Sequence, residues 1–173
     1  MNYTIRPAKS EDLSQILAIV NHAIEHSTAI YDYEPRTLQM QQSWFADKAL
    51  KNFPVLVADF GSEIVGFGTY GTFREKAAFN PTIEHSVYVK DGFQQQGIGK
   101  MLLTELISIA TAQNYHVMIG CIDADNSSSI KFHQGFGFVS CGTIREVGFK
   151  FGRWLDMTLM QLNLKEPKSP IKP

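Results

Sequence analysis

The stretch Thr82–Lys100 reads TIEHSVYVKDGFQQQGIGK and decides the fold. Its first half, Ile83–Val89, is rich in β-branched and aromatic residues, which predicts a buried strand. The strand is broken at Lys90-Asp91-Gly92, and the pattern Gln94-x-x-Gly97-Ile98-Gly99 then runs into apolar residues at helical spacing. The stretch therefore predicts a strand, a glycine-bearing turn and the N-terminus of a helix, in that order.

This predicted turn is suited to hold an anion. The N-terminus of a helix offers unpaired backbone N–H groups and the positive end of the helix dipole. Glycine lets a phosphate approach the backbone because it has no Cβ. A Walker loop is excluded because no Gly-Lys-Ser/Thr follows, and a dinucleotide fingerprint fails because Leu102 occupies the place of its third glycine. A tight turn that binds no ligand is the alternative.

The pattern that remains, Gln/Arg-x-x-Gly-x-Gly/Ala behind a strand, resembles the acetyl-CoA pyrophosphate loop of the GNAT superfamily of N-acetyltransferases. Three further segments narrow this resemblance to the phosphinothricin and methionine sulfone/sulfoximine acetyltransferases: IEHSVYV, Asn126…His133-x-x-x-Gly137-Phe138, and GFKFGRWLDMTLMQL. The resemblance covers the chain up to Lys165. It implies a single GNAT-like domain with acetyl-CoA as co-substrate and no metal. It also implies a homodimer that acetylates the α-amine of a small amino acid analogue: methionine sulfone, methionine sulfoximine or phosphinothricin.

Composition agrees with one domain, because 173 residues are enough for a full hydrophobic core. A net charge of −1 argues against nucleic acid or an acidic membrane surface as the main partner, and no apolar run reaches the roughly 20 residues that cross a bilayer. Cys121 and Cys141 are interpreted as buried free thiols, which fits a cytoplasmic protein. The five histidines show no metal-ligand spacing. We expect a domain over residues 1–164 and a flexible tail over 165–173.

The order of predicted elements indicates an α+β fold. Two strands that are each followed by a helix, Ile83–Val89 and Val117–Ile122, are expected to pair in parallel. Two pairs of consecutive strands are expected to be antiparallel: one joined by the Gly61-Ser62 turn, the other formed by Val139–Val147 and Trp154–Leu162. The prediction is one mixed, mostly antiparallel central sheet with helices on both faces. The loop Thr28–Pro35 is interpreted either as a lid over the core or, from the resemblance, as a wall of the substrate pocket.

Glu84 is the first candidate catalytic residue. Glu84 and His85 are adjacent in a strand, so their side chains point to opposite faces. A carboxylate in an apolar strand is seldom buried without a partner or a purpose. Its structural interpretation is an ion pair with Arg74. Its functional interpretation, which the resemblance implies, is a general base that removes a proton from the substrate ammonium, through a water molecule.

Acetyl transfer also requires groups that hold the thioester. The backbone of Val87–Val89 is expected to stabilise the oxyanion and to pair with the pantetheine arm as an added strand would. Relatives often carry arginines where this chain has Gln94-Gln95-Gln96, so pyrophosphate binding would depend more on backbone N–H groups and Lys100. The expected cofactor-binding residues are Val87, Tyr88, Val89, Gln95, Gln96, Gly97, Ile98, Gly99, Lys100 and Asn126, the last with a helix cap as its alternative.

His133 is the second catalytic candidate. Many members of the superfamily carry a tyrosine here, thought to protonate the leaving thiolate, and the histidine leaves three roles open: acid, base or CoA contact. The expected substrate-binding residues are Arg74, Glu75, Lys76, Glu84, His85 and Ser86. Two alternative functions are kept: an acetyltransferase acting on a protein N-terminus or polyamine, and a non-catalytic acetyl-CoA-binding module, against which the presence of both Glu84 and His133 argues.

Overall fold

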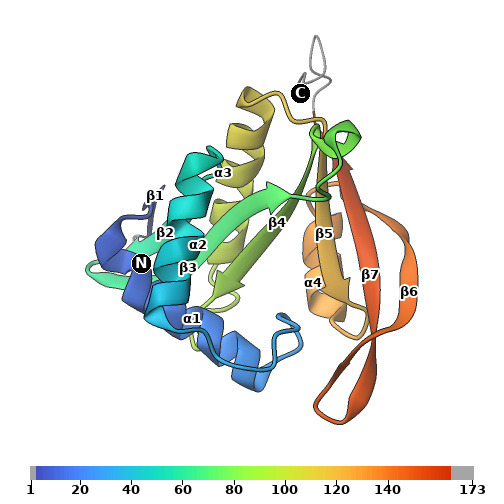
Figure 1. Cartoon of the computed structure of the whole chain (residues 1–173), viewed down its shortest axis with the longest axis horizontal. Coiled ribbons are helices and arrows are strands. Elements are labelled where there is room, and N and C mark those ends of the chain that lie inside the picture. Colours follow the sequence, from blue (N-terminus) through green and yellow to red (C-terminus); the bar gives the residue numbers. More distant parts are fainter. Residues whose placement is uncertain (1–2, 165–173) are drawn as a thin grey trace.

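A computed structural model describes residues 3–164, which form one seven-stranded sheet with helices on both faces (Figure 1). The strand order is β1-β2-β3-β4-β5-β7-β6. Only β4 and β5 are parallel, and the other neighbouring pairs are antiparallel. The predicted α+β fold, with its mostly antiparallel sheet, is therefore confirmed. The predicted tail at 165–173 lies outside the described residues.

The elements follow one another along the chain in an irregular alternation. The strands are β1 (Thr4–Pro7), β2 (Val55–Phe60), β3 (Glu63–Thr72), β4 (Thr82–Val89), β5 (Val117–Asp123), β6 (Val139–Lys150) and β7 (Arg153–Asn163). The helices are α1 (Leu13–His26), α2 (Leu38–Leu50), α3 (Ile98–Ala112) and α4 (Ser127–Gln134), with short 3₁₀ turns at Ser10–Asp12 and Ala77–Phe79. Both predicted antiparallel pairs, β2–β3 and β6–β7, are present. No helix within residues 3–164 is long and apolar enough to cross a membrane.

Two apolar cores lie on the two faces of the sheet. On one face, the stripe of α1 that includes Ile16, Val20 and Ile24 packs against β2 and β3. On the other, Leu102 and Leu106 of α3 are fully buried against the central strands. Figure 1 shows α1 and α2 in front of the sheet and α3 and α4 behind it. The alternation of side chains along β4 therefore sends successive residues into different environments.

The parallel pairing between β4 and β5 is short, and this opens the sheet. It joins only Thr82–Glu84 to Val117–Ile119. Beyond that point the two strands separate like the arms of a V (Figure 1). The second half of β4 consequently has a hydrogen-bonded neighbour in β3 but none in β5.

The β6–β7 hairpin carries a large share of the exposed apolar side chains. Val139, Ile144, Phe149 and Trp154 are all more than 40% exposed. The register of the hairpin shifts twice, between Ser140 and Gly142 and between Ile144 and Gly148. Within the described residues both cysteines are free, as predicted, but Cys141 is exposed on this hairpin and only Cys121 is partly buried. The prediction of two buried thiols was thus wrong for Cys141, because it lies in the exposed first part of β6, the edge strand of the sheet.

Candidate active site

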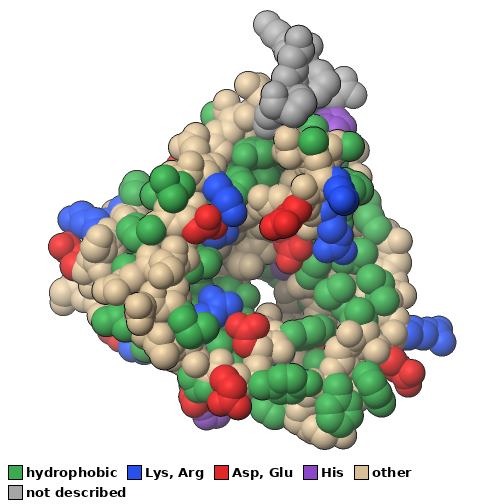
Figure 2. All heavy atoms as spheres, in the orientation of Figure 1, with side chains coloured by type: hydrophobic (Ala, Val, Ile, Leu, Met, Phe, Trp, Pro, Cys, Tyr) green, Lys and Arg blue, Asp and Glu red, His purple; other side chains and the backbone are tan. Residues whose placement is uncertain are grey.

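A cavity of about 780 Å³ occupies the V between β4 and β5. Its walls are the second half of β4, the turn before α3, the end of β5, the start of α4 and the loop after α1. Figure 2 shows the molecule hollowed at this place, with charged side chains around the opening. The volume falls in the range usual for pockets that bind small molecules. The predicted site residues that line it are Arg74, Glu84, His85, Ser86, Val87, Tyr88, Val89, Gln95, Gly97, Ile98, Gly99, Lys100, Asn126 and His133.

Three predicted residues do not line this cavity. The Gln96 side chain turns away to the Tyr3 hydroxyl and donates to the Gly92 carbonyl at 3.1 Å. Glu75 and Lys76 are exposed on the segment between β3 and β4. The prediction placed all three by sequence proximity to residues that do face the cavity. Side-chain direction in an irregular segment does not follow from proximity, so the binding roles of these three residues stay predictions.

The glycine turn has the geometry of an anion cradle. Gly97 is the N-cap of α3 with φ of +83°, in the left-handed region, and no side chain caps the helix. Ile98 is 1% exposed, so it anchors the turn in the core. A Cβ on Gly99 would lie 3.6 Å from the ring of Phe132 on α4. Within residues 3–164 no side chain caps these first-turn N–H groups, so they can bind a ligand, and Lys100 adds a positive charge beside them.

The free edge of β4 supplies further backbone donors. Lys90 donates its N–H to the Val65 carbonyl at 2.9 Å, which fixes the phase of the antiparallel ladder with β3. Residues alternate in such a ladder, so the Tyr88 amide points to β3, whereas those of Val87 and Val89 point away from it. They point to the side where β5 has already diverged. The amides of Val87 and Val89 therefore face the V.

Glu84 lies where the strands begin to part, opposite Ile119 of β5. The thiol of Cys121 and the cations Arg74 and Lys48 lie near its carboxylate, and each favours the charged form. Burial raises the pKa of Glu84 above its ordinary value and outweighs the cations, which lower it. Burial also raises the pKa of the Cys121 thiol to about 12 and lowers the pKa of Lys48 to about 8. The carboxylate is thus a poised proton acceptor, while the neighbouring thiol stays protonated.

His85 and His133 form a buried pair. Their Nε2 atoms are 3.2 Å apart, and His133 Nδ1 lies 2.6 Å from the Ser129 carbonyl oxygen. Because that carbonyl only accepts, Nδ1 of His133 carries the proton and its Nε2 accepts from His85. Burial lowers the pKa of both imidazoles, that of His85 to about 3, so the pair is neutral. Both rings pack against Gly120, where a Cβ would lie 3.3 Å from His85 Nε2.

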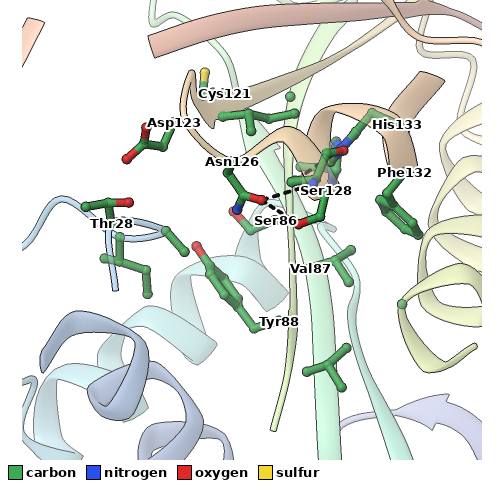
Figure 3. A pocket seen from close by; sticks show the side chains of 18 of the residues that line it. Thr28, Ser86, Val87, Tyr88, Cys121, Asp123, Asn126, Ser128, Phe132 and His133 are labelled. Carbon is green, nitrogen blue, oxygen red and sulfur yellow. Dashed lines mark hydrogen bonds between the residues drawn. The ribbon is translucent and has the colours of Figure 1, made fainter. Parts of the chain in front are cut away.

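Asn126 holds the start of α4. Its Oδ1 accepts from the Ser129 amide at 3.0 Å and from the Ser128 hydroxyl at 2.8 Å (Figure 3). The predicted helix cap is therefore present. The Nδ2 group is not used by this cap and lies at the cavity wall.

Other cavity residues escaped the sequence reasoning. Asp123, at the end of β5, is 6% exposed, and its Oδ2 lies 3.6 Å from Nη2 of Arg153. Tyr31, by contrast, lies in the loop Thr28–Pro35 that the sequence offered as a lid or a pocket wall; it lines the cavity, and its hydroxyl is buried without a hydrogen-bond partner among the described residues. Cys121 was interpreted only as a structural thiol. A sequence pattern gives no signal for these contacts, because they depend on how β5 and the loop after α1 meet β4.

Comparisons with known proteins agree with this geometry. Residues 5–159 match the model of the acetyltransferase (GNAT) domain family. The chain is 45% identical, over 98% of its length and 99% of the relative, to an L-methionine sulfoximine/L-methionine sulfone acetyltransferase of Pseudomonas aeruginosa. A crystal structure of a phosphinothricin acetyltransferase from Sinorhizobium meliloti in complex with acetyl-CoA superposes with a TM-score of 0.94 and 32% identity, covering 99% of this chain and 94% of that one. A ribosomal-protein-alanine N-acetyltransferase from Brucella melitensis superposes with a TM-score of 0.92 and 42% identity, covering 93% and 99%.

Proposed function

Because the chain belongs to the acetyltransferase (GNAT) domain family, we propose that it moves the acetyl group of acetyl-CoA to the α-amine of a small amino acid analogue. The proposed acceptors are methionine sulfone, methionine sulfoximine and phosphinothricin, and acetylation would detoxify them. The names of the relatives from Pseudomonas aeruginosa and Sinorhizobium meliloti support these substrates. The Brucella melitensis relative supports a second candidate, the N-terminal amine of a protein.

One observation carries the proposal: a single cavity joins the glycine turn to Glu84 along the free edge of β4. The backbone N–H groups of the Gly97–Lys100 turn and the side chain of Lys100 would bind the CoA pyrophosphate. Asn126 would donate a hydrogen bond from Nδ2 to CoA. The amide of Val89 would pair with the pantetheine arm. The Val87 amide lies nearer Glu84 along the strand, so it would stabilise the oxyanion.

Glu84 would act as the general base. It accepts a proton from the substrate ammonium through a water molecule, and the free amine then attacks the thioester carbonyl. A C–N bond forms, and the C–S bond breaks as the tetrahedral intermediate collapses. The thiolate then leaves and takes up, through solvent, the proton that the attacking nitrogen loses as it becomes an amide. Because Cys121 stays protonated, direct attack is favoured over an acyl-cysteine intermediate.

His133 would serve this reaction as a neutral imidazole. Its Nε2 is occupied by His85 and its Nδ1 by the Ser129 carbonyl. Neither nitrogen is left with a free proton for a leaving thiolate. This arrangement favours none of the three roles named from the sequence (acid, base or CoA contact); it favours a structural role, in which His133 fixes α4 against β4 beside the CoA site.

We also propose that the chain works as a cytoplasmic homodimer. The exposed apolar side chains of the β6–β7 hairpin, among them Phe149 and Trp154, provide a surface suited to a second copy. Sedimentation at micromolar concentration would measure the state directly.

Substrate choice gives the first prediction. In competition for limiting acetyl-CoA, we expect methionine sulfone, methionine sulfoximine and phosphinothricin to be acetylated ahead of methionine, an alanine-led peptide and a polyamine. An oxygen-rich, tetrahedral side-chain end needs N–H or hydroxyl donors, and Ser86 lies at the cavity wall to supply one. Mass spectrometry of the mixed products measures the order. Preference for the peptide would replace this proposal with the second candidate.

The substrate carboxylate requires a cation, and Arg74 offers a planar fork at the cavity wall. Its guanidinium stacks on Phe73, with Cζ 4.7 Å from the ring centroid. Arg74→Ala should raise the KM of the preferred acceptor about 10- to 100-fold, the range for a lost charged hydrogen bond. Lys76→Ala, outside the cavity, is the matched control and should leave this KM within twofold. An unchanged KM in Arg74→Ala would contradict the role of Arg74.

The glycine turn gives a third prediction. Gly97→Ala should raise the KM for acetyl-CoA about tenfold and leave that for the amine unchanged, because a Cβ strains a residue at φ of +83°. Gly61→Ala is the control: Gly61 also has a positive φ (+59°) and open space around it, but it lies in the β2–β3 turn. Steady-state kinetics with each substrate varied in turn measures both constants. Equal rises in the two constants would argue against the cradle.

A further inference from the structure

The last residues of β6 contact the loop that follows α1. Lys150 is 3% exposed, and its Nζ donates to the carbonyls of Ile24 at 2.6 Å, Ser27 at 2.9 Å and Ile30 at 2.6 Å. These three acceptors lie at the end of α1 and in the loop beyond it. Lys150 therefore extends from the edge strand into the interior, and its hydrogen bonds fix the end of α1 and the loop that follows it.

The chemistry of this contact matches an ammonium ion. An –NH₃⁺ group has three donors and no acceptor, and here each donor meets one carbonyl oxygen. Carbonyls at the end of a helix lack partners of their own and carry the negative end of the helix dipole. Burial lowers the pKa of Lys150, while Asp32 and the three carbonyls favour its charged form. Each donor and each acceptor at this junction is therefore satisfied.

Gly148 and Phe149, which precede Lys150 in β6, also contact this loop. The Tyr33 hydroxyl donates to the Phe149 carbonyl at 2.6 Å. A Cβ on Gly148 would lie 2.9 Å from Cε2 of Tyr31, so only glycine lets that ring lie against the strand. Gly148, Phe149 and Lys150 thus each contact the loop, and we call these three residues the β6 clamp.

The clamped loop forms the cavity wall near Glu84. Thr28, Ala29, Ile30 and Tyr31 all line the cavity. The Tyr31 hydroxyl lies near Asp123 and Cys121 at the end of β5, and Cys121 is two residues from Ile119, the residue that pairs with Glu84. The loop therefore belongs to the end of the cavity where the amine would react.

We propose that Lys150 is a positioning residue for the amine acceptor, because it fixes Thr28–Tyr31 as one wall of the acceptor pocket. The kinetic test of this inference rests on the proposed acetyltransferase function. It assigns specificity to a residue that does not itself line the cavity.

The experiment compares Lys150→Met, which keeps the length and removes the donors, with Lys51→Met, which removes an exposed lysine that pairs with Asp47. We expect Lys150→Met to raise the KM of the preferred amine about 10- to 100-fold, the range for losing hydrogen bonds from a charged group. The KM for acetyl-CoA should stay within twofold. Amide hydrogen exchange should become faster in residues 27–31 without a change in α3. Lys51→Met should match the wild type in each measurement.

Equal rises in both KM values, or an unchanged amine KM, would overturn the inference. If Lys150→Met does not fold, Tyr33→Phe removes only the bond to the Phe149 carbonyl and should produce the same changes at a smaller size; no change there would overturn the clamp. Failure of the proposed function looks different, because the wild type would then acetylate none of the amines. Hydrogen exchange in residues 27–31 would still test the clamp in that case.

Discussion

Glu84→Gln should lower kcat/KM for the amine about 10²- to 10⁴-fold, the loss typical of a removed general base. Glutamine has nearly the shape of glutamate but cannot take a proton. The pH dependence of kcat/KM provides a second test. Burial raises the pKa of Glu84, so the acid limb of the wild-type profile should lie above the ordinary pH range for glutamate, with activity falling as the pH drops through the raised pKa. This limb should flatten in Glu84→Gln.

Glu75→Gln is the matched control, since Glu75 is exposed and outside the cavity. It should keep both the rate and the acid limb of the wild type. Thermal unfolding and acetyl-CoA binding should be nearly unchanged in both variants, because Glu84 is not part of either apolar core. Wild-type activity in Glu84→Gln would assign proton removal to a chain of water molecules instead.

The sequence predicted the elements whose cause is local. The β-branched and aromatic residues of Ile83–Val89 identified β4, and the geometry of a strand put Glu84 and His85 on opposite faces. The structure pairs His85 with His133 of α4. Gly97 and Gly99 predicted the turn, and the structure has Gly97 as the N-cap of α3, without a side-chain cap in the described chain. These features need only neighbours within a few residues.

What the sequence could not predict depends on distant partners. Cys121 meets Glu84 only because β4 and β5 pair over Thr82–Glu84 and then part. Lys150 follows an exposed strand pattern, yet its three acceptors lie 120 to 126 residues earlier in the chain. The prediction also extended the site to Gln96, whose side chain points out of the cavity, where its Oε1 accepts a hydrogen bond from the Tyr3 hydroxyl. Register and side-chain direction are set by the packed fold, and no short window contains that information.

Val87→Pro tests whether the free edge of β4 takes part in catalysis. The Val87 N–H points into the V and bonds neither β3 nor β5, so proline would remove a donor that the sheet does not use. If this amide stabilises the oxyanion, kcat should fall about 10²- to 10³-fold, as for other removed oxyanion donors. Tyr88→Pro is the structural contrast, because the Tyr88 amide points to β3 and its loss should lower the thermal unfolding temperature strongly.

Val89→Pro separates the two functions assigned to this edge. Val89 lies two residues farther from Glu84, toward the glycine turn, so its amide should bind the pantetheine arm and not the reacting carbonyl. We expect Val89→Pro to raise the dissociation constant for acetyl-CoA, measured by calorimetry, with a smaller effect on kcat than Val87→Pro has. A folded Val87→Pro variant with unchanged kcat would show that the oxyanion is stabilised elsewhere. Folding has to be established first by thermal unfolding, because only a loss of kcat in an intact sheet can be assigned to the missing N–H group.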